Sequence, residues 1–327
     1  MGRHHRRLMK THPRYSMLTR LAILPLLMAV SATAQVTPEE AIGWHLFFDD
    51  ILSGPRNFSC GTCHLPEKGY EGGEALSKGA HDDVLGRNTP TVVNLSEAEY
   101  FFWDGRASSL AEQAEGPITN PQEMDLTMEE AAARVGGETH YRTAFEKAGL
   151  GEIDEQGILE AIAAFEATLE TGPTRFDRWI NGDRNALSEQ EERGRHVFFT
   201  KGNCALCHNG INLSDDDFHN IGTGTADDLG RYEIEKDDYY LGAFKTPALR
   251  NWKTREPFMH DGRFDTLRDV IDFYVNPTPT EIGEREIDAI PLTEQEITDL
   301  MAFLETFNGA WPELAPYEAA WEELVAP

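Results

Sequence analysis

Residues 60–64 read CGTCH and residues 204–208 read CALCH, so one Cys-x-x-Cys-His frame occurs twice in the chain. The chain has 327 residues, and these two motifs contain all four of its cysteines. Each motif places two thiols about one helical turn apart, with an imidazole directly after the second thiol. The interpretation of the whole sequence depends on what this repeated frame binds.

The repeated motif has three possible uses: a disulfide, a zinc site or covalent attachment of haem. A disulfide within one motif would close a very small ring, and a zinc site would need both distant cysteine pairs at one place. Neither uses the histidine, whereas covalent haem c uses all three groups: the thiols add to two vinyl groups and the histidine lies beneath the iron. The sequence therefore predicts two c-type haems, attached through Cys60, Cys63 and His64 and through Cys204, Cys207 and His208. A disulfide or zinc protein remains the alternative.

The N-terminal residues are typical of a secretory signal. Residues 1–20 are basic with no acidic residue, residues 21–30 are apolar but too short to span a bilayer, and small residues follow up to Ala34. We predict a signal peptide over 1–34 and a periplasmic location. No later segment has the apolar length of a transmembrane helix, so no membrane span is expected.

The chain is strongly acidic, with a formal net charge of −28. Removal of the predicted signal, which is basic, makes the remainder more negative. Such a charge argues against nucleic acid and anionic membranes as partners. It suits a basic partner or a salty habitat, and the sequence does not choose between them.

The duplication extends beyond the two motifs. Residues 43–64, GWHLFFDDILSGPRNFSCGTCH, resemble residues 194–208, GRHVFFTKGNCALCH, and a helix start precedes each. Apolar stripes predict further helices near 158–169, 267–274 and 297–307, separated by long loops. We predict a mostly α fold with two cytochrome c-like haem domains, residues 35–180 and 181–327, joined by a linker near 171–187.

Further segments show a resemblance that covers nearly all of the chain after the signal. The sequence resembles the bacterial di-haem cytochrome c peroxidases and their MauG-type relatives in RNTPTVVN (87–94), FFWDGRASSLAEQAEGPITNPQEM (101–124), FDRWINGD (176–183), GAFKTPALRN (242–251) and FMHDGRFDTL (258–267). The resemblance implies that hydrogen peroxide meets the N-terminal haem and that the C-terminal haem transfers electrons.

The resemblance also implies roles for residues around the first haem. Glu123 would be the acid–base that moves a proton between the peroxide oxygens, and Gln113 would orient peroxide or water. Pro117 lies between them at the matching place, and Trp103 matches the residue between the two haems. Arg106 is expected to be an electrostatic partner near the site.

The far side of the first haem departs from the family pattern. Ordinary members place a histidine ligand at the position of Ala80, and alanine cannot ligate iron. A slip of one residue in this loop would bring His81 to the iron. Otherwise His81 is a solvated loop residue, and the first haem is five-coordinate without an activation step.

The far side of the second haem also departs from that pattern. Ordinary members have a methionine where this chain has Tyr274, which the helical stripe turns inward; MauG-type proteins use tyrosine. A phenolate is a hard anionic ligand that favours the higher oxidation states of iron. A calcium ion is implied as well, bound by the Asn88 side chain and by the backbone carbonyls of Arg255 and Pro257.

Three functions follow. The first is a MauG-like enzyme that uses hydrogen peroxide to form a high-valent di-haem intermediate, which oxidises a periplasmic partner protein over a long distance. The second is an ordinary cytochrome c peroxidase, which reduces peroxide to water with electrons from a small cytochrome or cupredoxin. The third is a non-enzymatic di-haem electron carrier, against which Gln113 and Glu123 count.

Overall fold

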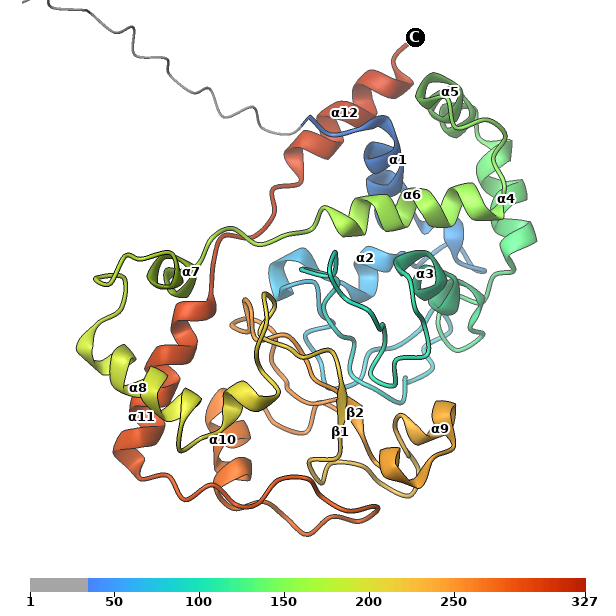
Figure 1. Ribbon diagram of the computed structural model, residues 1–327. Coiled ribbons are helices and arrows are strands. Elements are labelled where there is room, and N and C mark those ends of the chain that lie inside the picture. Colours follow the sequence, from blue (N-terminus) through green and yellow to red (C-terminus); the bar gives the residue numbers. More distant parts are fainter. Residues whose placement is uncertain (1–34) are drawn as a thin grey trace, which may run out of the picture. The chain divides into compact units, whose positions relative to one another are not determined.

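The computed structural model describes residues 35–327 (Figure 1). The predicted signal peptide, residues 1–34, lies outside the described residues. Residues Val36–Pro327 form one compact unit, and within it no helix is long and apolar enough to cross a bilayer.

The predicted mostly α class is confirmed. The helices are α1 (Pro38–Phe48), α2 (Cys60–Cys63), α3 (Leu110–Thr119), α4 (Met128–Gly137), α5 (Thr139–Ala148), α6 (Glu155–Ala167), α7 (Arg175–Ile180), α8 (Glu189–Phe199), α9 (Tyr232–Glu235), α10 (Leu267–Val275), α11 (Glu294–Leu304) and α12 (Ala315–Val325). Two short antiparallel strands, β1 (Phe218–His219) and β2 (Phe244–Lys245), pair Phe218 with Lys245. Long loops connect these elements (Figure 1).

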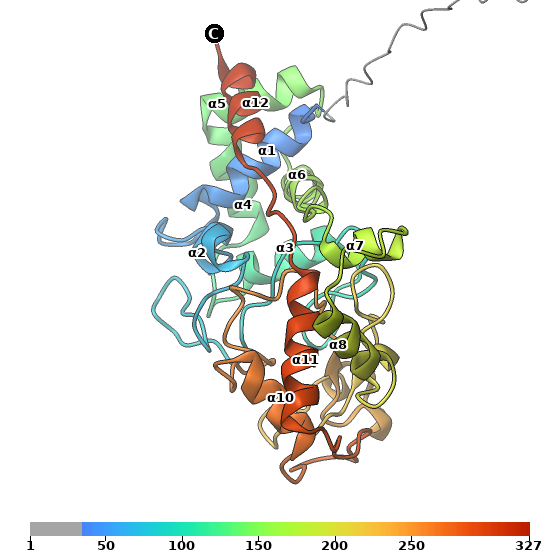
Figure 2. The same cartoon turned by 90° about the vertical axis from the view of Figure 1, so that its left-hand side faces the viewer.

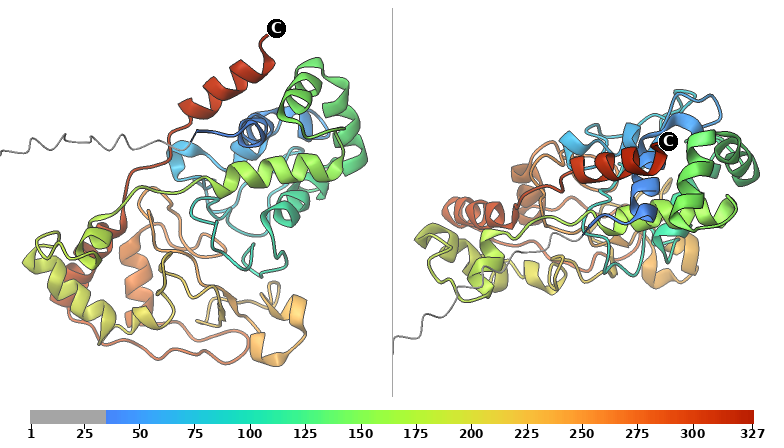
Figure 3. Two further views of the ribbon diagram at one scale, coloured as in Figure 1. Left: turned by 45° about the horizontal axis from the view of Figure 1, so that its top comes forward. Right: turned by 90° about the horizontal axis from the view of Figure 1, so that it is seen from above.

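One hydrophobic cluster belongs mainly to the N-terminal half. Helix α6 presents the predicted apolar stripe to this cluster, and Ile158, Ile162 and Phe165 are fully buried. Helices α1, α3 and α4 pack against α6. The C-terminal helix α12 also belongs to this cluster, because Tyr317 and Trp321 are buried in it and α12 contacts α1 and α5 (Figure 3). The last helix of the chain thus supports the helices that precede and follow the first motif.

A second hydrophobic cluster belongs to the C-terminal half. Helices α8 and α11 pack side by side, with α10 beside α11 (Figure 2). Phe198, Phe303 and Phe307 are buried at the centre of this cluster. The predicted linker near 171–187 contains the helix α7, whose first turn is held by a reciprocal capping box between Thr174 and Asp177.

The same type of helix precedes the haem motif in each half of the chain, as the predicted duplication implies. Helices α1 and α8 each have eleven residues and begin with a capping box, Thr37 with Glu40 and Ser188 with Glu191. Each has glycine at its sixth position, Gly43 or Gly194, and each ends in two phenylalanines. A later helix crosses each glycine: α6 crosses α1, and α11 crosses α8.

Candidate functional site

The first motif folds as a single helical turn. In α2 the backbone N–H of His64 donates to the carbonyl oxygen of Cys60 at 2.8 Å, so Cys60, Cys63 and His64 belong to one turn. The Nδ1 atom of His64 lies 3.0 Å from the carbonyl oxygen of Tyr70. Because a carbonyl oxygen only accepts, Nδ1 carries the proton and Nε2 is left with a free lone pair. Burial lowers the pKa of His64 to about 4, so the imidazole is neutral at pH 7.

The second motif repeats this arrangement. Cys204–Leu206 form a 3₁₀ turn, and the backbone N–H of His208 donates to the carbonyl oxygen of Cys204 at 2.9 Å. Nδ1 of His208 lies 3.1 Å from the carbonyl oxygen of Leu213, and burial lowers the pKa of His208. In both histidines Nδ1 is hydrogen-bonded to a backbone carbonyl oxygen, so Nε2 is the nitrogen that can bind a metal.

The alternative interpretations of the cysteines find no support in the described residues. All four thiols are free of disulfide bonds. Within residues 35–327, no cluster of potential metal ligands brings the two cysteine pairs together. Two separate Cys-x-x-Cys-His sites, each with an oriented neutral imidazole, fit two covalently attached haems.

A cavity of about 570 Å³ adjoins the first motif. This volume lies within the range of small-molecule and cofactor sites, roughly 300–1,000 Å³. Its walls include Cys60, Cys63 and His64, together with the four predicted catalytic residues Trp103, Gln113, Pro117 and Glu123. Segments 245–248 and 212–216 of the C-terminal half also line it. The cavity therefore joins residues that are widely separated in the sequence.

Helix α3 and the turn after it contribute one wall of the cavity. Gln113 and Pro117 are four residues apart on α3, so both face the cavity from the same side. Nδ2 of Asn120 donates to Oε1 of Glu123 at 2.7 Å. Burial raises the pKa of Glu123, against the lowering effects of Asn120 and Arg106. A buried carboxyl of this kind suits proton transfer.

Glu123 also faces the first motif. Burial and the nearby carboxylate of Glu123 raise the pKa of the Cys63 thiol to about 11. Arg106, the expected electrostatic partner, pairs with Asp104 at 3.0 Å and lies over the ring of Phe102.

Trp103 lies between the two halves of the chain. Its indole Nε1–H donates to the backbone oxygen of Asn88 at 2.8 Å. Its own backbone oxygen accepts from the N–H of Lys245 at 2.9 Å, and its ring meets His260 edge to face at 6.4 Å. The indole is thus fixed by contacts on both sides.

Tyr274 lies near the second motif. Tyr274 is a half-buried residue of α10. Its pKa is raised mainly by burial and, to a smaller extent, by the nearby thiols of Cys204 and Cys207. The residue that departs from the ordinary family pattern is therefore near the cysteines that would hold the second haem.

The structure places His81 away from the cavity. Its side chain is 46% exposed, and Nε2 lies 2.8 Å from Oδ2 of Asp125. The neighbouring Ala80 is buried, and its backbone N–H donates to the carbonyl oxygen of Glu123 at 2.7 Å. The position at which the resemblance implies a histidine ligand in ordinary members is thus next to Glu123, but here it carries only a methyl group.

Of the three predicted calcium ligands, Asn88 and Arg255 are buried and Pro257 is half-buried. The Asn88 amide donates to the carbonyl oxygens of Glu74 and Ala75, and the guanidinium of Arg255 is buried beside Glu71, with Nε 3.4 Å from Oε1. Asn88 and Arg255 both line the cavity, whereas Pro257 is outside its walls. Calcium binding stays a prediction.

Glu166 is a residue of this cavity that was not predicted from the sequence. Glu166 is only 3% exposed, burial raises its pKa to about 8, and its Oε2 has no hydrogen-bond partner. It lines the cavity and faces Cys60. The sequence does contain an indication that Glu166 is unusual. It lies four residues after Ile162 on the apolar stripe of α6, where a charged residue is unexpected.

Comparisons with known proteins agree with this site. The family described as di-haem cytochrome c peroxidase matches residues 37–185. The chain is 39% identical to the methylamine utilization protein MauG of Methylorubrum extorquens, over 84% of this chain and 79% of that protein. It is 35% identical to the cytochrome c551 peroxidase of Nitrosomonas europaea, over 85% of this chain and 83% of that protein. A solved MauG-like protein associated with microbial copper homeostasis is 28% identical, with a TM-score of 0.77 over 89% of this chain and 92% of that chain.

The chain therefore belongs to the di-haem cytochrome c peroxidase family, and it is a peroxidase-type oxidoreductase with two haem cofactors. Both MauG proteins and ordinary cytochrome c peroxidases are among its relatives.

Proposed function

We propose that this enzyme is of the MauG type: it uses hydrogen peroxide to oxidise a partner protein in the periplasm, to which the signal peptide over 1–34 directs it. The observation that carries the proposal is Tyr274, which lies near Cys204 and Cys207 where ordinary members have methionine. The buried Ala80, in place of a histidine ligand, supports the same subtype.

The chain's donor groups fit the two haems that the family implies. Cys60 and Cys63 would form thioethers to one haem and Cys204 and Cys207 to the other, with Nε2 of His64 and of His208 on the iron. When bound, the haems supply the iron that accepts the two oxidising equivalents of hydrogen peroxide. The backbone carbonyls of Tyr70 and Leu213 keep the two imidazoles in the required tautomer and orientation.

Glu123 is the proton-transfer group in this proposal. Its unprotonated carboxylate takes the proton from the inner oxygen of peroxide and returns it to the outer oxygen, which leaves as water. Asn120 holds Oε1 of Glu123 in place, and Gln113 presents its amide to the same cavity to orient the peroxide. Pro117 adds an apolar surface between them that restricts water.

Tyr274 and Trp103 hold and share the oxidising charge. A phenolate from Tyr274 would offer the iron of the second haem a hard anionic donor, which would favour its higher oxidation states. The indole of Trp103 is held between Asn88 and the C-terminal half, which suits electron transfer between the sites. We also propose that calcium, bound by Asn88, Arg255 and Pro257, stabilises this interface.

The second candidate is an ordinary cytochrome c peroxidase, which the 35% identity to the cytochrome c551 peroxidase favours. Stopped-flow mixing of hydrogen peroxide with the fully ferric protein separates the two. Immediate spectral change at both haems supports the MauG type. A reaction that requires prior reduction of one haem supports the ordinary peroxidase and rejects our proposal.

A further inference from the structure

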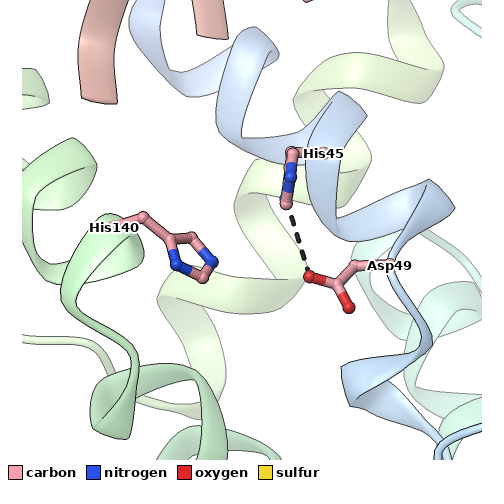
Figure 4. Close-up of side chains that lie close together, drawn as sticks. All are labelled: His45, Asp49 and His140. Carbon is pink, nitrogen blue, oxygen red and sulfur yellow. Dashed lines mark ion pairs between the residues drawn. The ribbon is translucent and has the colours of Figure 1, made fainter. Parts of the chain in front are cut away.

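A cluster of potential metal ligands lies apart from the haem sites, among helices of the N-terminal half. His45 and Asp49 are four residues apart on α1, and His140 comes from the first turn of α5 (Figure 4). Each side chain offers one ligand atom, and the three atoms all lie within 4.8 Å of one another. None of the three residues lines the 570 Å³ cavity.

His140 distinguishes this cluster from an ordinary hydrogen-bonded network. Its Nε2 is buried and has no hydrogen-bond partner. In Figure 4 the ring turns a nitrogen toward the carboxylate of Asp49. A buried nitrogen without a partner is costly, and a bound ion beside Asp49 would satisfy it.

The other groups hold the cluster in place. The Tyr141 hydroxyl donates to Oδ2 of Asp49 at 2.8 Å and lies 2.8 Å from Nδ1 of His45. Trp321 of α12 stacks on the His45 ring, with centroids 3.9 Å apart and planes at 21°, and meets His140 edge to face. Such supporting contacts orient metal ligands in proteins.

We propose that His45, Asp49 and His140 bind a divalent transition-metal ion of the zinc class. Two imidazoles and one carboxylate suit zinc and its neighbours, whereas calcium and magnesium prefer all-oxygen sites. The side chains are only half-buried, so an ion can enter from solvent and a water can complete a tetrahedral site. The ion cross-links α1 to α5 beneath α12 and thereby stabilises the half of the molecule that contains the first haem motif.

A rival explanation is that the hydrogen bonds of Tyr141 account for the cluster without an ion. Those bonds satisfy His45 and Asp49 but leave Nε2 of His140 without a partner. The metal site accounts for all three residues, and the two explanations predict different results on addition of zinc.

The test uses the haem-loaded protein, in which all four cysteines are thioethers and do not compete for zinc. The protein is treated with a chelator and dialysed against zinc ions alone, and bound zinc is measured by elemental analysis. We expect one zinc per chain, and X-ray absorption at the zinc edge should show two imidazoles with oxygen ligands. His140→Gln and Asp49→Asn should each weaken zinc binding by about tenfold or more.

His196→Gln is the matched control, because His196 is an exposed histidine of α8 and its loss should leave zinc binding unchanged. Haem absorbance and thermal unfolding show whether each variant is folded. Zinc should raise the melting temperature of the wild type and of His196→Gln, but not of the other two variants. Absence of stoichiometric zinc in the wild type, or full zinc binding in folded His140→Gln, would overturn the proposal.

Discussion

Gly43 of α1 lies directly against the backbone of Ala161 of α6: a methyl group built on Gly43 would be 1.8 Å from the Ala161 carbonyl oxygen. The second half repeats the contact, since a methyl group on Gly194 of α8 would be 1.9 Å from the carbonyl oxygen of Asp299. Both distances are far below any van der Waals contact. The two helix pairs that lie beside the haem motifs can therefore approach this closely only because the crossing residue is glycine.

Gly43→Ala should force α1 and α6 apart and destabilise the protein by about 1–3 kcal/mol or more, as overpacking does. Thermal unfolding of the haem-loaded protein measures the change. Gly137→Ala is the control, because nothing lies within 4 Å of a methyl group there and alanine favours the helix. Equal melting temperatures for Gly43→Ala and the wild type would contradict the close crossing.

Glu123→Gln should slow the reaction with peroxide by about 100- to 10,000-fold, the usual contribution of a positioned acid–base. The carboxylate is the active form and its pKa is raised, so in the wild type the rate should fall as the pH drops through that raised pKa. The variant should lack this acidic limb. Stopped-flow rates across pH provide the measurement, with the exposed Glu129→Gln on α4 as control. An unchanged rate in Glu123→Gln would reject its role.

Tyr274→Met should raise the reduction potential of the second haem, on the order of 100 mV within the ~0.8 V range that axial ligands span. The reason is that a soft thioether favours ferrous iron and a phenolate favours ferric iron. Spectroelectrochemical titration measures the potential. Tyr239→Phe, at a residue 65% exposed, should have no effect. If the spectrum and potential of Tyr274→Met equal those of the wild type, Tyr274 is not a ligand.

Trp103→Phe should keep both haems but interrupt electron transfer between them, because phenylalanine is much harder to oxidise than tryptophan. After one equivalent of peroxide, the ferric signals of both haems should disappear in the wild type, whereas the ferric signal of the second haem should persist in the variant. Electron paramagnetic resonance measures both signals. Trp179→Phe on α7 is the control. Loss of both ferric signals in Trp103→Phe would show that another route connects the sites.

Local rules predicted the elements well because they depend on neighbouring residues. The capping boxes of α1 and α8 and the apolar stripe of α6 follow from spacings of three and four residues, and all are found in the structure. The segment expected to be a linker contains α7, because the capping box of Thr174 and Asp177 and the buried Phe176 outweigh its glycine and proline residues. The domain division at 180 and 181 and the calcium site stay predictions.

The sequence by itself determined the two haem-attachment motifs, the duplicated helix starts and the tyrosine in place of methionine, because each is a matter of residue type and short spacing. Only the tertiary structure decided that Glu166 faces Cys60, that His81 turns to Asp125, and that α12 packs on α1. It also brought His140 to His45 and Asp49. These contacts join residues tens or hundreds of positions apart, and they depend on how distant helices and loops pack together, which no local pattern specifies.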